Sequence, residues 1–541
     1  MSDSSPRFSS RFAFLVSALG IAVGTGNIWR FPRIAASNGG DDGAGAFLVA
    51  WVIFLFMWSI PLIIVEYVMG RTSRKGTIGA FAHFMGEKFA FLGGFIGFVA
   101  AAISFYYSVV VGWNIFYFGN MALSDLPNTT ESSNALWNQF QNSNFPILFH
   151  AIAMSVGGFA IVKGVKSIEK VNKILIPTLL VIVLVSVIRA ITLPGAMSGI
   201  SYLFTPNWSQ LSDPRLWLEA LTQNAWDTGA GWGLFLTYAI YIRKRYGLIK
   251  NAFTTAIGNN LVSLLAAIMV FSTVFSILGN EMGMAKSEIL EVMKASGPGA
   301  TGLTFIWMPQ LFAKMAFGKP LAILFFLGLT FAGFSSLISM LELAVKNLRD
   351  MGIERKTAVG WIVGVCFVMG IPSAKNLDIL SNQDFVWGVA LMLAGVFVAL
   401  AAIKYGLSRI VKEISLENED DWSFPSWWQP VINYVVPVIG VVIFSWWMWL
   451  SATVYAPADW YDPTSLYSVA TCVVQWSLPM TAFFMLNKWM NNRLENSIKS
   501  LSGFELPPQQ PKILLPRLNS SGLSSNVVPA GELPITTNFP P

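Results

Sequence analysis

Two glycine-rich segments interrupt long apolar stretches of this chain and restrict the folds that it can adopt. Residues 20–27 read GIAVGTGN, and residues 227–233 read DTGAGWG. Each segment lies midway along a stretch long enough to cross a bilayer, which takes about 20 apolar residues. Backbone polar groups that a break sets free cannot stay unpaired in hydrocarbon. Both segments are therefore expected to line a cavity or to hold a ligand.

The composition predicts an all-α integral membrane protein. Of the 541 residues, 54% are hydrophobic and only 12% are charged, whereas soluble proteins carry about 25% charged residues. The apolar stretches predict twelve transmembrane helices, the last two over 430–455 and 464–490, after a charged break at 417–421. Their centres are Ala22, Phe56, Val109, Ser155, Val181, Phe235, Leu265, Gly333, Val363, Leu393, Phe444 and Val474.

The distribution of Lys and Arg predicts the orientation of these helices. Alternate loops carry the positive charges, as cytoplasmic loops do, whereas the loops at 123–145 and 456–465 contain none. An even number of helices puts both termini on one side. We therefore expect a multi-pass protein of the plasma (cell inner) membrane with both termini cytoplasmic. The same bias explains the net charge of +6 without a nucleic-acid partner.

The chain termini and the cysteines give little indication of function. The first apolar run begins near Phe12 and contains Arg30, so it does not resemble a cleavable signal peptide. After about Asn496 the chain is rich in Pro, Ser and Asn, which predicts a disordered cytoplasmic tail. Cys366 and Cys472 lie within apolar spans and indicate neither a disulfide framework nor a metal site.

The two breaks occupy corresponding positions in two halves of the chain, which is the best sequence indication of a transporter's central site. Carbonyl oxygens set free at 20–27 suit a hard cation such as sodium, and Asn27 adds a side-chain oxygen. Free amides and the positive ends of half-helices suit a carboxylate. The alternative is that these small residues only allow close helix packing.

Ionisable residues inside apolar spans are functional candidates. Asp227, at the second break, would stay charged beside a cation and take up a proton without one. It could also cap the half-helix that follows. Arg30 follows the first break and Asp384 opens the tenth helix. These two would either close the outer mouth as an ion pair or each extend to its own interface.

Other polar residues in the spans allow more than one interpretation. Ser335 and Ser336 could complete an oxygen cage, although such serines commonly bond to a carbonyl one turn back. Tyr107 offers a hydroxyl to a carboxylate, or it only packs. Glu66 and Glu342 are explained equally well by placement at the cytoplasmic interface. No Walker loop, catalytic triad or metal-binding cluster is present in the sequence, so we predict that the protein is not an enzyme.

Several motifs resemble those of the neurotransmitter:sodium symporters, including the bacterial amino-acid transporters among them. The most specific is the first-helix signature: SSR at 9–11, GTGNIWRFP at 24–32, NGG at 38–40 and GAF at 45–47. Further matches, within a resemblance that spans about residues 10–490, are PL at 61–62, Glu66, MGR at 69–71, YY at 106–107, Trp113, Gly164, EK at 169–170, Asn172, TY at 237–238, Tyr241, AG at 332–333 and SS at 335–336.

The resemblance implies a 5+5 inverted repeat in which helices 1 and 6 are broken at the membrane centre. It divides the chain into an N-terminal cytoplasmic tail (1–10), a first repeat of helices 1–5 with the following external loop (11–215), a second repeat of helices 6–10 (216–410), helices 11 and 12 (411–490) and a disordered cytoplasmic tail (491–541). The tryptophan-rich last two helices would contact either lipid or a second copy in a homodimer.

The resemblance also implies two sodium sites, a substrate site and two gates. One sodium ion would use Gly20, Val23, Ala332, Ser335 and Ser336, and the other Ala22, Asn27, Asp227, Asn259 and the substrate carboxylate. Tyr107, Thr25 and Gly26 would hold that carboxylate beneath a lid formed by Trp226. The substrate site would also include Ile21, Ala22, Ile103, Asp227, Gly229, Trp232, Ser336 and Met340. The outer gate would be Arg30 with Asp384, and the inner gate Tyr241 with Asp350.

Three positions refine this expectation. Asp227 departs from the family pattern, which has Thr or Ser there. Ser263 matches the serine of chloride-dependent members, where chloride-independent bacterial members have a glutamate. We therefore predict chloride independence, with Asp227 supplying the fixed negative charge; direct sodium binding and proton exchange are the alternatives. Gly24 replaces the aspartate of amine-transporting members, which predicts a neutral amino acid as substrate. The expected function is sodium-coupled uptake by alternating access, and the alternative is a non-transporting amino-acid sensor or scaffold.

Overall fold

A computed structural model describes residues 6–294, 302–417 and 421–502 of the chain. The described residues up to Ser497 form one compact unit. Helices make up nearly all of its regular structure, and the one pairing of extended backbone found among the described residues is an isolated bridge between Ala44 and Pro206. The unit is therefore all-α, as the composition predicts.

The α-helices are α1 (Arg11–Ala22), α2 (Thr25–Ser37), α3 (Gly45–Phe54), α4 (Ile60–Ser73), α5 (Thr77–Met85), α6 (Ala90–Leu123), α7 (Thr130–Gln141), α8 (Phe145–Ile161), α9 (Val165–Ile191), α10 (Ala196–Phe204), α11 (Pro214–Thr228), α12 (Leu234–Ala239), α13 (Leu248–Val274), α14 (Lys286–Lys294), α15 (Met308–Ala313), α16 (Gly318–Asp350), α17 (Arg355–Lys375), α18 (Leu377–Tyr405), α19 (Leu407–Glu417), α20 (Trp428–Pro430), α21 (Val436–Leu450) and α22 (Val469–Ser502). The shorter 3-10 and π-helical segments are η1 (Leu55–Ser59), η2 (Glu87–Phe89), η3 (Trp208–Ser212), η4 (Phe275–Glu281), η6 (Gly302–Trp307), η7 (Val431–Val435) and η8 (Ser451–Tyr455).

Within the described residues, nine helices are long and apolar enough to cross a membrane, and two bent helix pairs raise this number to eleven. All twelve predicted centres lie in helices. The remaining predicted span corresponds to α11 and α12. The second glycine break divides it into two helices, and each is too short to count as a membrane span by itself. The pair α7 and α8 bends by 72°, and α8 is the piece that holds the predicted fourth centre, Ser155.

The first predicted break separates α1 from α2, which bend by 47° relative to each other. Helix α1 begins after Ser10, whose hydroxyl accepts a hydrogen bond from Ala13 N. It ends before Val23, which has an extended backbone (φ −77°, ψ 96°). Gly24 is also extended, and its N–H is satisfied by the Asn27 side chain. The two unwound residues thus sit between two half-helices, as the sequence predicts.

The second predicted break separates α11 from α12. Gly229, Gly231 and Gly233 all adopt left-handed backbone conformations (φ +67°, +91° and +79°), which L-residues with a side chain rarely tolerate. A side chain at Gly231 would also lie only 2.6 Å from the backbone of Gly395. Glycine is therefore required here for both conformation and packing.

Glu66 stabilises this second break from helix α4. Its fully buried carboxylate accepts hydrogen bonds from Gly231 N (2.5 Å) and Leu236 N (3.0 Å). Of the two interpretations that the sequence left open for Glu66, these contacts favour a specific role over simple interface placement. Amides that the unwound segment sets free need acceptors in a water-free interior, and this carboxylate provides them.

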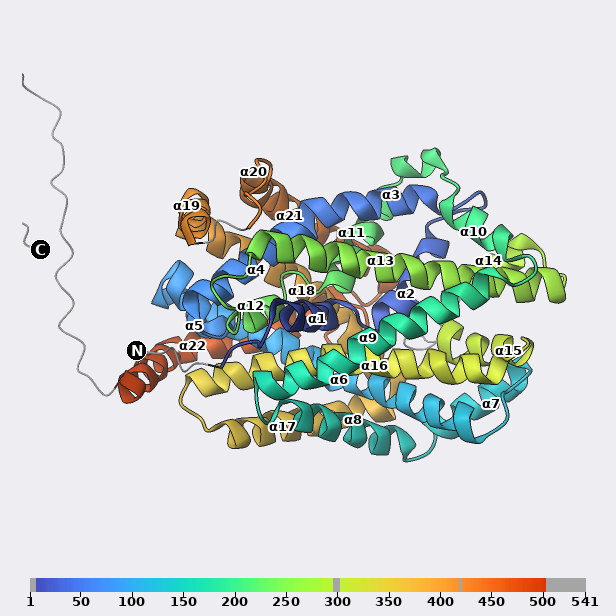
Figure 1. Ribbon diagram of the computed structural model, residues 1–541, viewed down its shortest axis with the longest axis horizontal. Coiled ribbons are helices and arrows are strands. Elements are labelled where there is room, and N and C mark those ends of the chain that lie inside the picture. The colour runs from blue at the N-terminus through green and yellow to red at the C-terminus, as the bar shows by residue number, and fades with distance from the viewer. Residues whose placement is uncertain (1–5, 295–301, 418–420, 503–541) are drawn as a thin grey trace, which may run out of the picture. The chain divides into compact units, whose positions relative to one another are not determined.

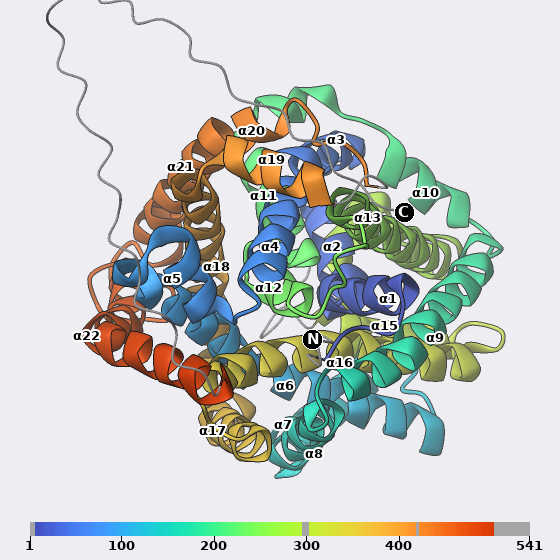
Figure 2. The same cartoon turned by 60° about the vertical axis from the view of Figure 1, so that its left-hand side comes forward.

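Figures 1 and 2 show the broken helices in the middle of the bundle. Helix α1 packs against α9, α13 and α16, and α12 packs against α4. The long helices α6 and α16 lie side by side and form one wall. The peripheral helices α17, α21 and α22 expose large apolar side chains such as Trp361, Val438 and Phe484. Such apolar exteriors suit hydrocarbon surroundings.

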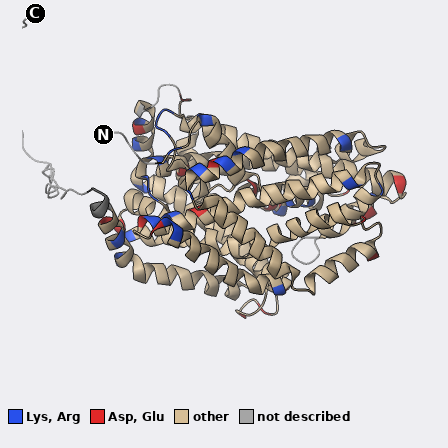
Figure 3. Cartoon of the chain, turned by 60° about the horizontal axis from the view of Figure 1, so that its bottom comes forward, with Lys and Arg blue, Asp and Glu red and all other residues tan. Residues whose placement is uncertain are grey.

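Charged residues are concentrated at one end of this unit. Figure 3 shows most Lys and Arg residues near the end where the chain begins, while the middle of the bundle is largely uncharged. Helix α22 continues to Ser502, so the predicted disordered tail is wrong for residues 491–502. The cause is that the helical pattern continues beyond the last apolar residues of the span. Residues 503–541 lie outside the described part of the chain.

Candidate functional site

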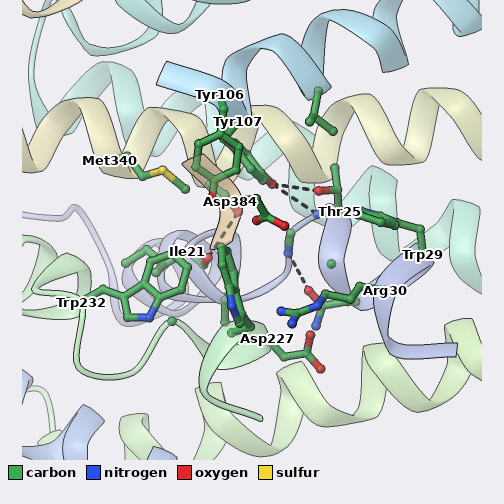
Figure 4. A pocket seen from close by; sticks show the side chains of 18 of the residues that line it. Ile21, Thr25, Trp29, Arg30, Tyr106, Tyr107, Asp227, Trp232, Met340 and Asp384 are labelled. Atoms are coloured by element: carbon green, nitrogen blue, oxygen red, sulfur yellow. Dashed lines mark hydrogen bonds between the residues drawn. The ribbon is translucent and has the colours of Figure 1, made fainter. Parts of the chain in front are cut away.

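A cavity of about 130 Å³ lies where the two breaks face each other (Figure 4). Since a water molecule occupies about 30 Å³ of liquid, this space suits a small solute. All but one of the predicted substrate-site residues line it. The lining residues are Ile21, Ala22, Gly24, Thr25, Gly26, Asn27, Trp29, Arg30, Arg33, Tyr106, Tyr107, Val110, Trp226, Asp227, Gly229, Trp232, Leu234, Ser336, Met340, Leu380 and Asp384.

Ile103 is the exception and corrects the sequence prediction. It is fully buried and does not line the cavity. On helix α6 the cavity wall is formed about one turn later, by Tyr106, Tyr107 and Val110. The apolar part of the cavity is bounded by Ile21, Trp232 and other apolar side chains. Ile103 lies on the same face of α6 as Tyr107 and Val110, so the difference concerns position along the helix. An apolar span does not show where along it the cavity ends.

The N-terminus of α2 points its free amides toward this cavity. Thr25 N and Thr25 Oγ1 both lie within hydrogen-bond distance of the Tyr107 hydroxyl (3.3 and 3.2 Å), as Figure 4 shows. A Cβ atom at Gly24 would lie 3.0 Å from Ser336 Oγ and 3.2 Å from Tyr107 Oη. The packing around Gly24 thus leaves little room for a larger side chain.

The residues predicted to hold one sodium ion come together beside this end of α2. One terminal atom of the Asn259 amide lies 3.1 Å from the carbonyl oxygens of both Ala22 and Asp227. As an oxygen it accepts from Asn27 Nδ2 at 2.8 Å, and three oxygens then converge. Buried oxygens that face each other fit a hard cation, which requires several oxygen ligands. If the Asn259 amide is turned over, its nitrogen takes this place and donates to both carbonyls. The contacts around an amide decide which orientation is assigned.

The residues predicted for the second ion also meet, between α1 and α16. Ser335 Oγ donates to Ala332 O (2.9 Å) and lies 3.4 Å from Val23 O. Ser336 Oγ lies 3.4 Å from Ile21 O, and a Cβ at Gly20 would lie 3.3 Å from Ser335. Both serines therefore reach across to the broken helix, in addition to the local bond of Ser335. This set of hydroxyl and carbonyl oxygens also fits sodium.

Asp227 is buried and hydrogen-bonded on both carboxylate oxygens. Gln223 Nε2 donates to Oδ1 (2.5 Å) and Ser263 Oγ donates to Oδ2 (3.2 Å). Ser263 in turn accepts from Asn27 Nδ2 at 2.7 Å. The indole N–H of Trp51 is buried without a partner among the described residues. The carboxylate thus occupies a pocket of polar donors that joins directly to a predicted sodium ligand.

Two indoles enclose the apolar part of the cavity. The rings of Trp226 and Trp232 meet edge to face, with centroids 5.1 Å apart. The Arg30 guanidinium lies 5.2 Å from the Trp226 ring centroid. Met340 approaches from helix α16 (Figure 4). Figure 4 shows the charged residues Arg30 and Asp227 on the side of the cavity away from Trp232 and Met340.

The predicted outer-gate residues both line the cavity mouth. In the described part of the chain no ion pair joins Arg30 to Asp384, and Asp384 is exposed. A second arginine, Arg33, lines the same mouth. Sequence reasoning missed Arg33, although its position three residues after Arg30 puts both side chains on one face of α2.

On the side of the cavity away from Arg30, the two predicted inner-gate residues belong to separate bonded groups. The Tyr241 hydroxyl donates to Glu342 (2.9 Å), which pairs with Arg355 (2.5 Å). Asp350 pairs with Lys346 and accepts from the backbone N–H of Gly76. Glu342 is fully buried and paired with Arg355, which favours a specific role over the simple interface placement that the sequence also allowed.

Comparison with known proteins identifies relatives along most of the chain. The profile of the Sodium:neurotransmitter symporter family matches residues 5–145 and 142–496. An uncharacterized sodium-dependent transporter of Methanocaldococcus jannaschii is 30% identical, over 80% of this chain and 88% of the relative. A sodium-dependent neutral amino acid transporter of Rattus norvegicus, B(0)AT3, is 26% identical, over 92% of this chain and 97% of the relative. The crystal structure of MhsT in complex with L-phenylalanine has a TM-score of 0.70 and 28% identity, and covers 82% of this chain and 99% of MhsT.

Proposed function

Because the chain belongs to the sodium:neurotransmitter symporter family, we propose that it couples uptake of a neutral amino acid to inward sodium movement by alternating access. One observation carries this proposal. The unwound backbones of two broken helices, the Tyr107 hydroxyl and two sets of facing oxygens surround a single small cavity. Such midplane cavities between repeats are where secondary transporters bind substrate and coupling ions.

The polar groups of the cavity favour a substrate with a carboxylate. Thr25 and Gly26 lie at the positive end of α2, where a negative group is stabilised. Gly24 has no carboxylate to offer a substrate amine, and a side chain at this position would crowd Ser336 Oγ and Tyr107 Oη. No charged group faces the apolar region around Trp232 and Met340, which supports a neutral side chain. B(0)AT3 is named for neutral amino acids, and MhsT holds L-phenylalanine, both consistent with this class.

Two sodium ions are the proposed coupling ions. Asn27, Asn259 and the carbonyls of Ala22 and Asp227 would hold one, and Gly20, Val23, Ala332, Ser335 and Ser336 the other. Bound sodium would supply positive charge beside the substrate carboxylate. Each charge that moves inward gains about 2.3 kcal/mol per 100 mV of membrane potential. Ion movement therefore provides the driving force that an ATP site would provide elsewhere.

We further propose that transport is independent of chloride. The two donors that face Asp227, from Gln223 and Ser263, would suit a bound anion equally well. The carboxylate takes that place and provides a permanent negative charge next to Asn27. The donors that could bind chloride are then occupied by Asp227, and the negative charge that chloride would supply is already present.

The gate residues support an outward-facing conformation. Arg30 and Asp384 stand apart at the outer mouth, whereas Tyr241, Glu342 and Arg355 are joined on the other side of the cavity. Alternating access would reverse this pattern, closing the first pair and separating the second group. In the proposed topology both termini face the cytoplasm of a plasma membrane, because the Lys and Arg side chains gather at that end.

Uptake into proteoliposomes tests the proposal. Purified protein is reconstituted and supplied with a panel of radiolabelled amino acids, with an inward sodium gradient or with potassium on both sides. We expect sodium-dependent accumulation of one or more neutral amino acids, and no accumulation of acidic or basic ones. Sodium-dependent binding without accumulation would reject transport and favour a sensor instead.

A further inference from the structure

We propose that the Asn27 side chain is a removable cap on the N-terminus of α2, which it leaves when it becomes a sodium ligand. Ion binding would then free the Gly24 N–H within the cavity. The inference rests on the proposed sodium site at Asn27 and adds to it a physical link between the ion and the helix end.

Hydrogen bonds define the capped state. Asn27 Oδ1 accepts from Gly24 N at 2.7 Å. The Asn27 amide group donates to Asn259 Oδ1 (2.8 Å) and to Ser263 Oγ (2.7 Å). These two donor bonds fix the direction in which the amide oxygen points. Asn27 is also buried, so water does not compete for these bonds.

Asn27 Oδ1 is the atom that the sodium ion and Gly24 would share. A cation there would face the positive end of an N–H dipole and the positive N-terminus of α2. In the capped state Asn27 Nδ2, and not Oδ1, faces Asn259 and Ser263. The amide must therefore turn over before its oxygen can ligate an ion on that side, and this rotation withdraws Oδ1 from Gly24 N. The neighbouring Ala22 and Asp227 carbonyls, both 3.1 Å from the Asn259 amide, lie on the side from which an ion would be held.

The second amide at this helix end is also satisfied internally. Thr25 N lies 3.3 Å from the Tyr107 hydroxyl. Gly24 and Thr25 both line the cavity, yet the protein's own side chains occupy both amides. A carboxylate therefore meets a helix end whose donors are already used. Release of Gly24 N–H by ion binding would make the site receptive, and linkage requires that substrate strengthen ion binding equally.

Ser263 connects the cap to Asp227. It accepts from Asn27 and donates to Asp227 Oδ2. The carboxylate thus orients the serine hydroxyl, and the serine orients the amide of Asn27. Ser263 is in this sense a positioning residue for the cap.

Hydrogen–deuterium exchange of the purified full-length protein tests the proposal without any amino acid present. Fragmentation that resolves single residues reports the Gly24 amide in potassium chloride and in sodium chloride. We expect Gly24 to exchange roughly two- to tenfold faster in sodium, which corresponds to loss of one typical hydrogen bond. Equal or slower exchange in sodium would overturn the proposal.

Two variants provide a matched comparison in potassium. Asn27→Ala removes the cap, so Gly24 should exchange as fast as in the sodium-treated wild type. Asn259→Ala removes another proposed sodium ligand but leaves the cap, so Gly24 should exchange as in the untreated wild type. Unchanged exchange in Asn27→Ala would also reject the cap. Transport does not enter these measurements, so failure of amino-acid uptake and failure of the cap are distinguishable.

Discussion

At the scale of single residues, Asp227 distinguishes this chain most clearly from other members of its family. Its two oxygens accept from Gln223 and Ser263. If the carboxylate replaces a bound anion, then its removal should leave donors that recruit one. The donors converge from α11 and α13, and both side chains are buried.

Asp227→Ser is therefore expected to make uptake depend on chloride. In gluconate medium, uptake should fall on the order of tenfold or more, because charge-assisted hydrogen bonds are lost. Chloride should restore much of it, while the wild type should be equally active in both media. The double variant Asp227→Ser with Ser263→Glu returns a carboxylate to the same pocket and should no longer need chloride. A wild type that is inactive in gluconate contradicts the assignment.

Trp232 is expected to limit the size of the substrate side chain. Its ring meets Trp226 with centroids 5.1 Å apart, which closes the apolar end of the cavity. Trp232→Phe should raise uptake of L-phenylalanine relative to L-alanine by roughly tenfold, the range expected for extra space in an apolar pocket. Trp58→Phe is the control, since Trp58 is buried but does not line the cavity. An unchanged ratio in Trp232→Phe would show that another residue sets the limit.

At the scale of elements, the two broken helices depend on side chains that supply missing hydrogen-bond partners. Asn27 does this for the N-terminus of α2, and Glu66 does it for the segment before α12. An unwound segment within a membrane protein persists only if its freed backbone groups are satisfied. These side chains are therefore as necessary to the breaks as the glycines.

Glu66→Gln is expected to destabilise the protein by about 1.5–3 kcal/mol, the range for hydrogen bonds to charged groups. The new amide N–H₂ would face a backbone N–H, so one donor would lose its acceptor. Thermal unfolding monitored by size-exclusion chromatography should show a lower midpoint. Glu413→Gln is the control, because Glu413 forms a partly exposed pair with Arg409 and such pairs contribute little. Equal midpoints for the two variants would contradict this role.

The sequence was sufficient to predict the helical breaks, since glycines within apolar stretches have few other uses there. It was also sufficient to single out Asp227, because an ionisable residue in the middle of an apolar span is energetically costly and is therefore a functional candidate. It left Glu66 and Glu342 undecided, because their partners Gly231 and Tyr241 lie more than 100 positions away in the chain. For Ile103 the helix face agrees with that of Tyr107, but an apolar span does not show where along it the cavity ends. Contacts between helices, and the depth of a cavity between them, are not readable from one sequence.

At the scale of the whole molecule, the proposed transport cycle would use the charges on the two sides of the cavity as a pair of alternating gates. The group around Glu342 is bonded, while Arg30 at the other end of the cavity contacts Trp226 rather than Asp384. In this proposed cycle, a fixed charge at Asp227 would stay with the protein. It therefore cancels no part of the charge that the coupling ions carry.

Each turnover is therefore expected to move net positive charge inward. Two sodium ions with one neutral zwitterion carry two charges, and an inside-negative potential of 100 mV then contributes about 4.6 kcal/mol at about 2.3 kcal/mol per charge. In proteoliposomes with a fixed sodium gradient, a potassium diffusion potential set by valinomycin should markedly increase accumulation. The same liposomes without valinomycin are the control. Accumulation that does not respond to the potential would mean that a counter-ion leaves in exchange, and outward proton movement through Asp227 would then be the interpretation to pursue.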